Sequence, residues 1–300
     1  MKLNRTLYLY YHGIGDSLLF STVLYYLGRE RNQRYLVGSP HPEIYAGNPH
    51  VKHLPFTSQT TTYRAAKIMR ALRMVKEYIH MDYYHAGPIP QRHIMHLLAD
   101  RMGLAEMPAR PLIFLSDAEK AAQLLPVSEK PWVAIQSTGN TKWTENKNWG
   151  TEKFARTAQL LAPDFSLVQI GSPADPALPV DLNLCGKIGI RQVFQVLRQC
   201  TLFIGQAGFL SHAARAVEVP SVIVYGGFEA PWQTGYTQNI NLYSPVHCAP
   251  CWLESKCPYD KMCMEMITPE RVHEEVLSLR KLGKEVDSSM MESDFDPKPN

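Results

Sequence analysis

The stretch TLFIGQAGFLSHAARAVEVPSVIVYGG, residues Thr201–Gly227, decides the fold. Two short apolar runs, Thr201–Ile204 and Ser221–Tyr225, are typical of buried strands. Small residues between 205 and 208 predict a tight turn, and Ser211–Val217 predicts a short helix that can lie close to a sheet. This order of strand, turn, helix and strand predicts a parallel α/β unit.

The turn of this unit has two interpretations. Gly205, Ala207 and Gly208 let a ligand approach the backbone closely. A helix that opens from such a turn presents free N–H groups and its positive dipole end to an anion. An ordinary βαβ crossover gives the same pattern, so the rest of the chain has to decide.

Alternating strands and helices extend in both directions from this stretch and predict an α/β fold with two halves, each built on a parallel sheet. We expect the halves to be an N-terminal domain over residues 1–127 and a C-terminal domain over 128–284, with a disordered tail over 285–300. The best linker candidate is Pro126–Pro131. The predicted strands are Thr6–Tyr11, Tyr35–Gly38, His50–Phe56, Pro108–Leu115, Trp132–Gln136 and Ser166–Ile170. The predicted helices are Ser17–Arg29, Ala65–Ile79, Gln91–Met102, Ser116–Leu125, Thr151–Leu161, Ile190–Cys200 and Thr268–Lys281.

Composition and charge exclude some classes of function. The 300 residues are 45% hydrophobic and 20% charged, which is ordinary for a globular protein. The net charge is only +3 and no basic–aromatic motif stands out, so we expect no nucleic-acid binding. Residues 1–125 hold 15 Lys and Arg against 9 Asp and Glu. This basic half is either a solvated face or a surface for an acidic acceptor or an anionic membrane. Without a signal peptide or an apolar span, we expect a cytoplasmic protein.

Several short motifs, taken in order, resemble glycosyltransferase family nine, the heptosyltransferases. They are Gly13-Ile14-Gly15-Asp16-Ser17-Leu18-Leu19, Gly47-Asn48-Pro49-His50-Val51, Lys147-Asn148-Trp149, Gly186-Lys187, Ser211-His212-Ala213-Ala214, Cys248-Ala249-Pro250-Cys251, Cys257-Pro258, Cys263-Met264 and Ile267-Thr268-Pro269-Glu270. The resemblance covers about residues 6 to 280. It implies a GT-B fold, two Rossmann-like domains that face a cleft. It also implies inverting transfer of a sugar from an ADP-sugar, usually ADP-heptose, to a hydroxyl of the lipopolysaccharide core, with no cofactor for catalysis.

Asp16 is the candidate catalytic base. An inverting displacement needs a base at the acceptor hydroxyl, and Asp16 begins the first helix directly after a strand. The proposed base of the family occupies this place. The alternative is a helix-capping carboxylate, which would be a weaker base. His12 is a lesser candidate.

The departing diphosphate needs positive charge and N–H donors. Lys147 matches the phosphate lysine of the family, and Ser137 and Thr138 match hydroxyls that contact phosphate. The turn with Ala207 and Gly208 would add backbone N–H groups. Lys142 is a nearby alternative to Lys147.

The resemblance also implies which residues bind the nucleoside. Asp175 matches an acidic position that holds ribose hydroxyls, and Ile188 matches an apolar contact to the base. A surface-loop carboxylate and a core isoleucine are the alternatives. His212 matches the family motif as well.

One departure concerns the donor sugar. The family usually has an acid at the turn after Ile204, where this chain has Gln206. Gln206 can hydrogen-bond a sugar but supplies no charge. The departure leaves the donor sugar open, and it suggests a nucleotide-sugar-binding protein without turnover as one alternative function.

The cysteines Cys248, Cys251, Cys257 and Cys263 follow the spacing C-x2-C-x5-C-x5-C. Four thiolates can close a tetrahedral site, so a structural zinc or iron is one interpretation, beside free thiols and a disulfide. Some relatives that glycosylate autotransporter proteins bind iron through cysteines. A protein O-heptosyltransferase acting on a secreted protein is therefore a second alternative. The favoured partners remain an ADP-sugar donor and an acidic glycolipid or glycan acceptor, with peripheral contact to the inner membrane.

Overall fold

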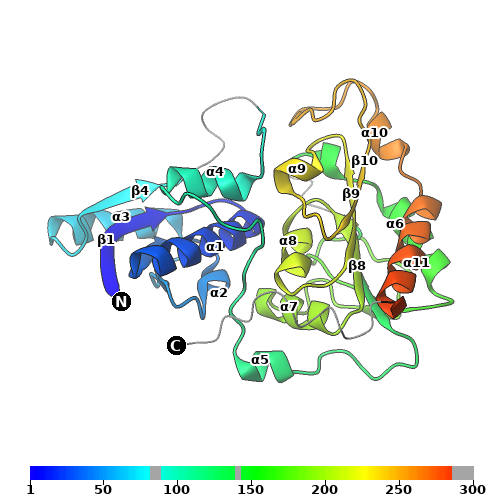
Figure 1. Cartoon of the computed structure of the whole chain (residues 1–300), viewed down its shortest axis with the longest axis horizontal. Helices are drawn as coiled ribbons and strands as arrows, with labels where there is room; N and C mark the ends of the chain where they lie inside the picture. The colour runs from blue at the N-terminus through cyan, green and yellow to red at the C-terminus, as the bar shows by residue number, and fades with distance from the viewer. Residues whose placement is uncertain (82–88, 139–142, 286–300) are drawn as a thin grey trace.

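The computed structural model describes residues 1–81, 89–138 and 143–285, which form two lobes side by side (Figure 1). Each lobe is built on a parallel sheet, with strand order β3-β2-β1-β4 in the first and β10-β9-β8-β5-β6-β7 in the second. This confirms the predicted α/β class. The first sheet consists of β1 (Lys2–Leu9), β2 (Gln33–Gly38), β3 (Val51–His53) and β4 (Glu77–His80). The second consists of β5 (Trp132–Ile135), β6 (Ser166–Gln169), β7 (Leu182–Asn183), β8 (Leu202–Gln206), β9 (Ser221–Gly226) and β10 (Ile240–Tyr243).

Helices cover both sheets. In the first lobe they are α1 (Ile14–Arg31), α2 (Pro42–Tyr45), α3 (Gln59–Ala71) and α4 (Ile94–Arg101). A short α5 (Asp117–Ala121) lies between the lobes in sequence. The second lobe has α6 (Thr151–Leu161), α7 (Ile190–Arg198), α8 (Phe209–Ala216), α9 (Pro231–Thr234), α10 (Met262–Glu265), α11 (Pro269–Glu285) and the 3₁₀ turn η1 (Glu145–Lys147).

The stretch that decides the fold forms the predicted unit. β8, α8 and β9 follow one another, and β8 pairs in parallel with β9 from Phe203 opposite Ser221 to Gln206 opposite Val224. Both strands are buried throughout, because they lie inside the sheet and are covered on two sides. Their carboxyl ends therefore meet at one edge of the second sheet.

The prediction of one helix over Ala65–Ile79 is wrong. α3 ends at Ala71, and the chain reverses through Arg73, which has a left-handed φ of 55°. The following residues form β4, which pairs in parallel with β1. Val75, buried in the turn, anchors this reversal against the sheet.

The predicted strand Pro108–Leu115 does not form. Two prolines in this stretch lack the N–H that a ladder needs, and β4 occupies the free edge of β1. The stretch instead runs over α1, where Leu112 donates its N–H to the hydroxyl of Thr22 at 2.9 Å.

Other element ends differ by smaller amounts. The predicted helix Ser116–Leu125 is only the five-residue α5, because the N–H groups of Leu124 and Leu125 donate to Gln199 instead. Ser116 is its N-cap residue, and Ser116 and Glu119 form a capping box. The predicted strand His50–Phe56 shortens to β3, and the N-cap residue of α6 is Gly150.

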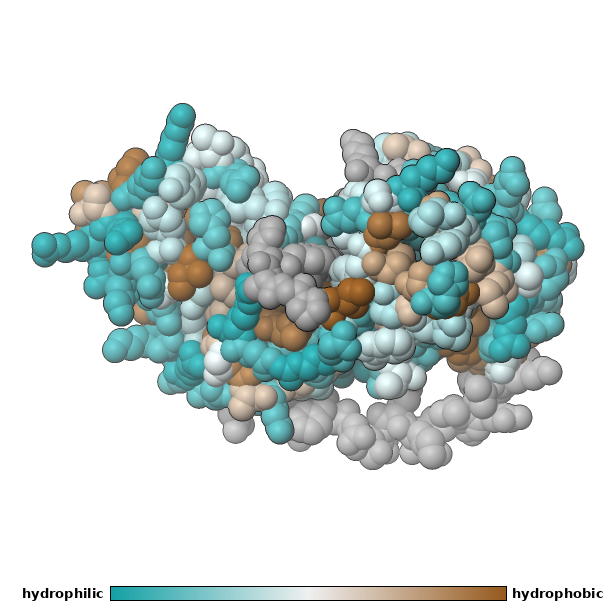
Figure 2. All heavy atoms as spheres, turned by 90° about the horizontal axis from the view of Figure 1, so that it is seen from above, coloured by the Kyte–Doolittle hydropathy of each residue, from teal (hydrophilic) through white to brown (hydrophobic). Residues whose placement is uncertain are grey.

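Helix contacts join the lobes, among them α1 with α8, α2 with α7, and α4 with α9. One buried hydrophobic cluster contains residues of both lobes, from Tyr10 to Tyr225. In the described part of the chain, no helix is both long and apolar enough to cross a bilayer. Seen from above, the surface is mainly hydrophilic, with small hydrophobic patches near the boundary of the lobes (Figure 2).

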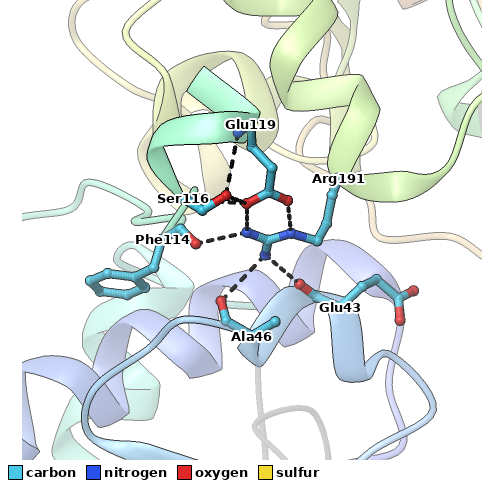
Figure 3. Close-up of polar contacts among 6 residues, drawn as sticks. All are labelled: Glu43, Ala46, Phe114, Ser116, Glu119 and Arg191. Atoms are coloured by element: carbon cyan, nitrogen blue, oxygen red, sulfur yellow. Dashed lines mark hydrogen bonds and ion pairs between the residues drawn. The ribbon is translucent and has the colours of Figure 1, made fainter. Parts of the chain in front are cut away.

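Arg191 is a second point of contact between the lobes (Figure 3). It lies on α7 and pairs with the carboxylate of Glu119. Its guanidinium also donates to the backbone carbonyls of Glu43 at 2.9 Å, Ala46 at 3.3 Å and Phe114 at 2.8 Å. The planar guanidinium, which has five N–H donors, thus ties α7 to the end of α2 and to the segment before α5. The domain boundary at 127/128 falls between α5 and β5 and stays a prediction.

Candidate functional site

The starts of α1 and α8 meet where the two lobes face each other. A Cβ added at Gly15 would lie 3.2 Å from Cδ2 of His212 and 3.3 Å from Cα of Phe209. Only a glycine therefore allows this close approach without a shift of the neighbouring helix. Asp16 is the next residue, in the first turn of α1. The predicted base and the predicted His212 thus come from different lobes to one place.

Asp16 is not the N-cap residue of its helix. That position belongs to Gly13, which makes no side-chain cap. The carboxylate turns back toward it, since a Cβ added at Gly13 would lie 3.0 Å from Oδ2 of Asp16. Asp16 is half-buried, and its charge acts on His41 and Tyr45 of the same lobe.

His212 is held in an uncharged pair with Tyr236. Its Nδ1 lies 2.6 Å from the hydroxyl of Tyr236, and both residues are buried. Burial, together with the charges of His93 and Lys147, lowers the pKa of His212 to about 3. Burial also raises the pKa of Tyr236 well above its usual value. At neutral pH this pair offers hydrogen bonds near Asp16 but no charge.

His93 lies beside the same pair, on the other lobe. It caps α4, where its Nδ1 accepts the N–H of Met95 at 3.2 Å, and its ring lies 5.5 Å from that of Tyr236. Burial lowers the pKa of His93 to about 4. Its Nε2 has no hydrogen-bond partner among the described residues.

Lys147, at the end of η1, has a buried partner. Its Nζ lies 2.5 Å from Oε1 of Glu229, a carboxylate that is only 3% exposed. The same ammonium lies over the rings of Trp143 at 4.9 Å and Phe228 at 5.4 Å. An ion pair and two cation–π contacts therefore fix the lysine that the resemblance assigns to phosphate.

Gln206 connects the end of β8 to the same loop. Its Oε1 accepts the N–H of Trp149 at 3.1 Å, two residues beyond Lys147. Its Nε2 is buried and has no partner among the described residues. Gln206 therefore still has a donor to offer.

The turn after Gln206 has open space on one side. Gly208 has a φ of 156°, which favours glycine, and a Cβ added there would meet no atom of the described residues within 4 Å. Its carbonyl accepts the hydroxyl of Ser211 at 2.7 Å, so the turn is closed by the first turn of α8. Ala207 is buried beside it.

Ser137 and Thr138 follow β5 at the same edge of the sheet. Both are buried. The hydroxyl of Ser137 accepts the amide N–H of Gln169 at 3.0 Å, so it already has a partner within the lobe. The alternative lysine, Lys142, lies outside the described residues.

Asp175 and Ile188 lie farther along this edge, on the side of β6. Asp175 accepts the N–H of Ser172 at 3.1 Å and its hydroxyl at 2.8 Å, so its carboxylate closes the turn after β6. Ile188 is partly buried against the main hydrophobic cluster. Asp175 thus has a structural role in its loop, and Ile188 has one in packing, as the alternatives from the sequence proposed. Their roles in binding ribose and base stay predictions.

The four cysteines are free thiols of intermediate exposure. Burial raises the pKa of the thiols of Cys251 and Cys263, and the neighbouring thiols add to the effect. Within the described ranges, no three His, Cys, Asp or Glu side chains are arranged to hold a metal ion. The sequence therefore supplies four thiols for the predicted zinc or iron site, but the structure does not place them together as ligands.

Sequence reasoning gave three residues no role in this site. Glu229, Tyr236 and His93 lie in loops or at a helix start, and only tertiary packing brings them to Lys147 and His212. His12, the lesser base candidate, has its Nε2 3.0 Å from the carbonyl of Met81.

Two parallel α/β lobes with polar side chains at their meeting edges define the GT-B class of glycosyltransferase-like folds. Residues 71–262 match the family model of glycosyltransferase family 9 (heptosyltransferase). The chain therefore belongs to glycosyltransferase family 9, as the motifs predicted.

Named relatives agree with this membership. Lipooligosaccharide heptosyltransferase 2 from Campylobacter jejuni subsp. jejuni serotype O:6 is 29% identical over 151 residues, which is 44% of this chain and 47% of the relative. The same enzyme from serotype O:2 is 30% identical over 153 residues, 45% of this chain and 47% of the relative. The match thus spans about half the length of these curated relatives.

Solved structures confirm the fold. The iron-containing dodecameric glycosyltransferase TibC from enterotoxigenic E. coli superposes with a TM-score of 0.72 at 18% identity, covering 95% of this chain and 81% of TibC. The E. coli ADP-heptose lps heptosyltransferase II superposes with a TM-score of 0.69 at 17% identity, covering 95% and 100%. At these identities the likeness establishes the GT-B fold alone.

Proposed function

We propose that this protein is an inverting glycosyltransferase that moves heptose from ADP-heptose to a hydroxyl of a lipopolysaccharide core or a related glycan. Family membership supports the class of reaction. The printed names of the matched relatives, and a TibC structure in complex with ADP-D-beta-D-heptose, support the donor. The observation that carries the proposal is the close approach of Gly15, the residue before Asp16, to His212 of the opposite lobe, with the charge of Lys147 acting on His212.

In this proposal Asp16 takes the proton of the acceptor hydroxyl. The acceptor oxygen forms a bond to the anomeric carbon while the bond from that carbon to the diphosphate oxygen breaks. A single displacement inverts the configuration, and ADP leaves with the electron pair. A positioned carboxylate contributes typically about 10²- to 10⁴-fold to such a step.

The second lobe would receive the developing negative charge. Lys147 supplies the cation, and the turn of Ala207 and Gly208 supplies backbone N–H groups beside open space. The Nε2 of Gln206, which has no partner among the described residues, would donate a hydrogen bond to ADP-heptose. Asp175 and Ile188 would hold the ribose and the base.

The first lobe would receive an acidic acceptor. Helix α3 presents Arg64, Lys67 and Arg70 to solvent, and nearby Ile68 and Leu72 are also exposed. Such a surface fits phosphorylated glycolipid head groups at an anionic membrane. The peripheral membrane contact expected from the sequence is assigned to this face.

The cysteine segment is kept outside the chemistry. The proposed reaction assigns no step to the four cysteines. A protein O-heptosyltransferase and a binding protein without turnover remain the alternative functions, and they differ from the proposal in acceptor and in turnover.

A thermal-shift panel with ADP, UDP, GDP and CMP tests the donor assignment. We expect ADP to stabilise the wild type and to stabilise Lys147→Met clearly less. A preference for UDP or GDP would keep the fold and replace the donor. No stabilisation by any nucleotide would overturn the proposed function.

A further inference from the structure

Glu229 is an unusual residue in this fold. It lies on the loop between β9 and α9, and it is the only Asp, Glu, Lys or Arg in the fully buried class among the described residues. A buried carboxylate is costly unless a cation and hydrogen bonds compensate it. The buried carboxylate therefore needs a cation nearby, and Lys147 supplies it.

The cation of this pair is less buried than the anion. The side chain of Lys147 is 17% exposed, against 3% for Glu229. The rings of Trp143 and Phe228 enclose the ammonium on other sides. A lysine ammonium has three N–H donors on a flexible stem, so it can exchange one anion for another from the accessible side.

A second observation at the same edge points to a ligand. Gln206 is 1% exposed, and its Nε2 has no partner among the described residues. Its Oε1 is fixed by Trp149, in the same loop as Lys147. Because β8 and β9 are neighbours in the sheet, the segments that bear Gln206 and Glu229 leave the sheet side by side.

We infer that Glu229 is the resident counter-ion of Lys147, which the diphosphate of donor or product displaces. This inference rests on the proposed function, and it makes Glu229 a positioning residue that acts through Lys147. A diphosphate that binds Lys147 has to compete with the Glu229 carboxylate for the ammonium. It is also repelled by the negative charge of that carboxylate. Glu229 thereby weakens the hold on ADP and lets the product leave.

The test is the affinity for ADP, measured by calorimetry on wild type and Glu229→Gln. Removal of one competing charge should tighten ADP binding by about tenfold, a modest effect for charges at contact distance. In steady state, KM for the donor and kcat should both fall, because ADP release becomes slower. A purely structural role would weaken ADP binding or leave it unchanged.

Two variants serve as checks. Glu265→Gln removes the carboxylate of another Lys–Glu pair in this lobe, in which Lys153 Nζ lies 2.8 Å from Glu265, and it should bind ADP like the wild type. Glu229→Asp keeps the charge but retracts it, and its ADP affinity should lie between those of wild type and Glu229→Gln. If Glu229→Gln does not fold, Glu229→Asp decides by the same criterion.

The outcomes separate the two claims. Wild type that binds ADP, with no tighter binding in either Glu229 variant, overturns the counter-ion role and leaves the proposed function standing. Wild type that binds no ADP overturns both.

Discussion

Asp16 is the residue on which the proposed chemistry depends, and Asp16→Asn tests it. The amide keeps the shape of the side chain in the first turn of α1 but accepts no proton. We expect kcat to fall by about 10²- to 10⁴-fold, the usual range for loss of a positioned base. The dissociation constant of ADP should change little, because Lys147 and the turn after β8 belong to the other lobe.

Asp117→Asn is the matched control for that variant. Asp117 also lies in the first turn of a helix, and its side chain is fully exposed. Its kcat should equal that of the wild type. A wild-type kcat in Asp16→Asn would contradict the assignment of the base.

Tyr236 carries a prediction about stability. Tyr236→Phe removes the hydroxyl that lies 2.6 Å from Nδ1 of the buried His212. The free energy of unfolding should fall by about 1–3 kcal/mol, the usual cost of a buried polar atom left without its partner. Urea denaturation measures this, with Tyr243→Phe, which is half-buried in the same lobe, as the control. Equal losses in both variants would show that the His212 contact adds nothing.

Site residues that lie in local motifs could be predicted from the sequence, and site residues outside such motifs were missed. Asp16 and His212 lie in recognisable strand–turn–helix segments. Their positions at the carboxyl ends of the two sheets could therefore be predicted, because ligands of parallel α/β folds bind there. Glu229 lies in a loop after β9 with no local pattern, and only the packing of η1 against that loop brings it to Lys147. The ligand roles of Ser137, Asp175 and Ile188 stay predictions.

Among the elements, α3 is the one we expect to meet the acidic acceptor or membrane. Arg64, Ile68 and Leu72 recur every four residues on its exposed side, and Lys67 and Arg70 flank them. The triple variant Arg64→Glu, Lys67→Glu, Arg70→Glu should lose most of its binding to vesicles that contain anionic lipid. Wild-type binding should weaken as salt rises, because the attraction is screened.

Cosedimentation with vesicles measures this binding, and neutral vesicles are the control. The triple variant should keep the ADP affinity of the wild type, since α3 lies far from the second sheet (Figure 1). Equal binding of both proteins to anionic vesicles would contradict the role of α3.

Element prediction succeeded where pattern and tertiary structure agreed. The buried strands β8 and β9 and the helix between them were predicted from apolar runs and small residues. It failed at β4, because the basic pattern of α3 continues through Arg73 and Lys76 into a strand that only β1 stabilises. It failed again at Pro108–Leu115, whose apolar residues pack on α1 and not in a sheet.

For the whole molecule, the contact of Arg191 with Glu119 predicts a pH-dependent stability (Figure 3). Hydrogen bonds from Arg191 lower the pKa of Glu119 from 4.5 to about 2. A carboxyl with a lowered pKa in the folded state stabilises it fully above the unfolded value, and this contribution is lost as pH falls from about 4.5 toward 2. Glu119→Gln should therefore lower Tm at pH 6 and lower it much less at pH 3.

Thermal melts across this range measure the difference. Arg191→Lys keeps the charge but loses the fork of donors to three backbone carbonyls, so it should also lower Tm at pH 6. A Tm difference between wild type and Glu119→Gln that stays constant with pH would show that this ion pair does not link stability to pH.

Transfer of heptose itself tests the central claim most directly. Wild type and Asp16→Asn are incubated with ADP-heptose and a lipopolysaccharide core acceptor that lacks heptose, and the acceptor is examined by mass spectrometry. The account predicts one added heptosyl group and one released ADP per acceptor with wild type, and neither with Asp16→Asn. Wild type that binds ADP-heptose but adds no sugar to this acceptor would contradict it.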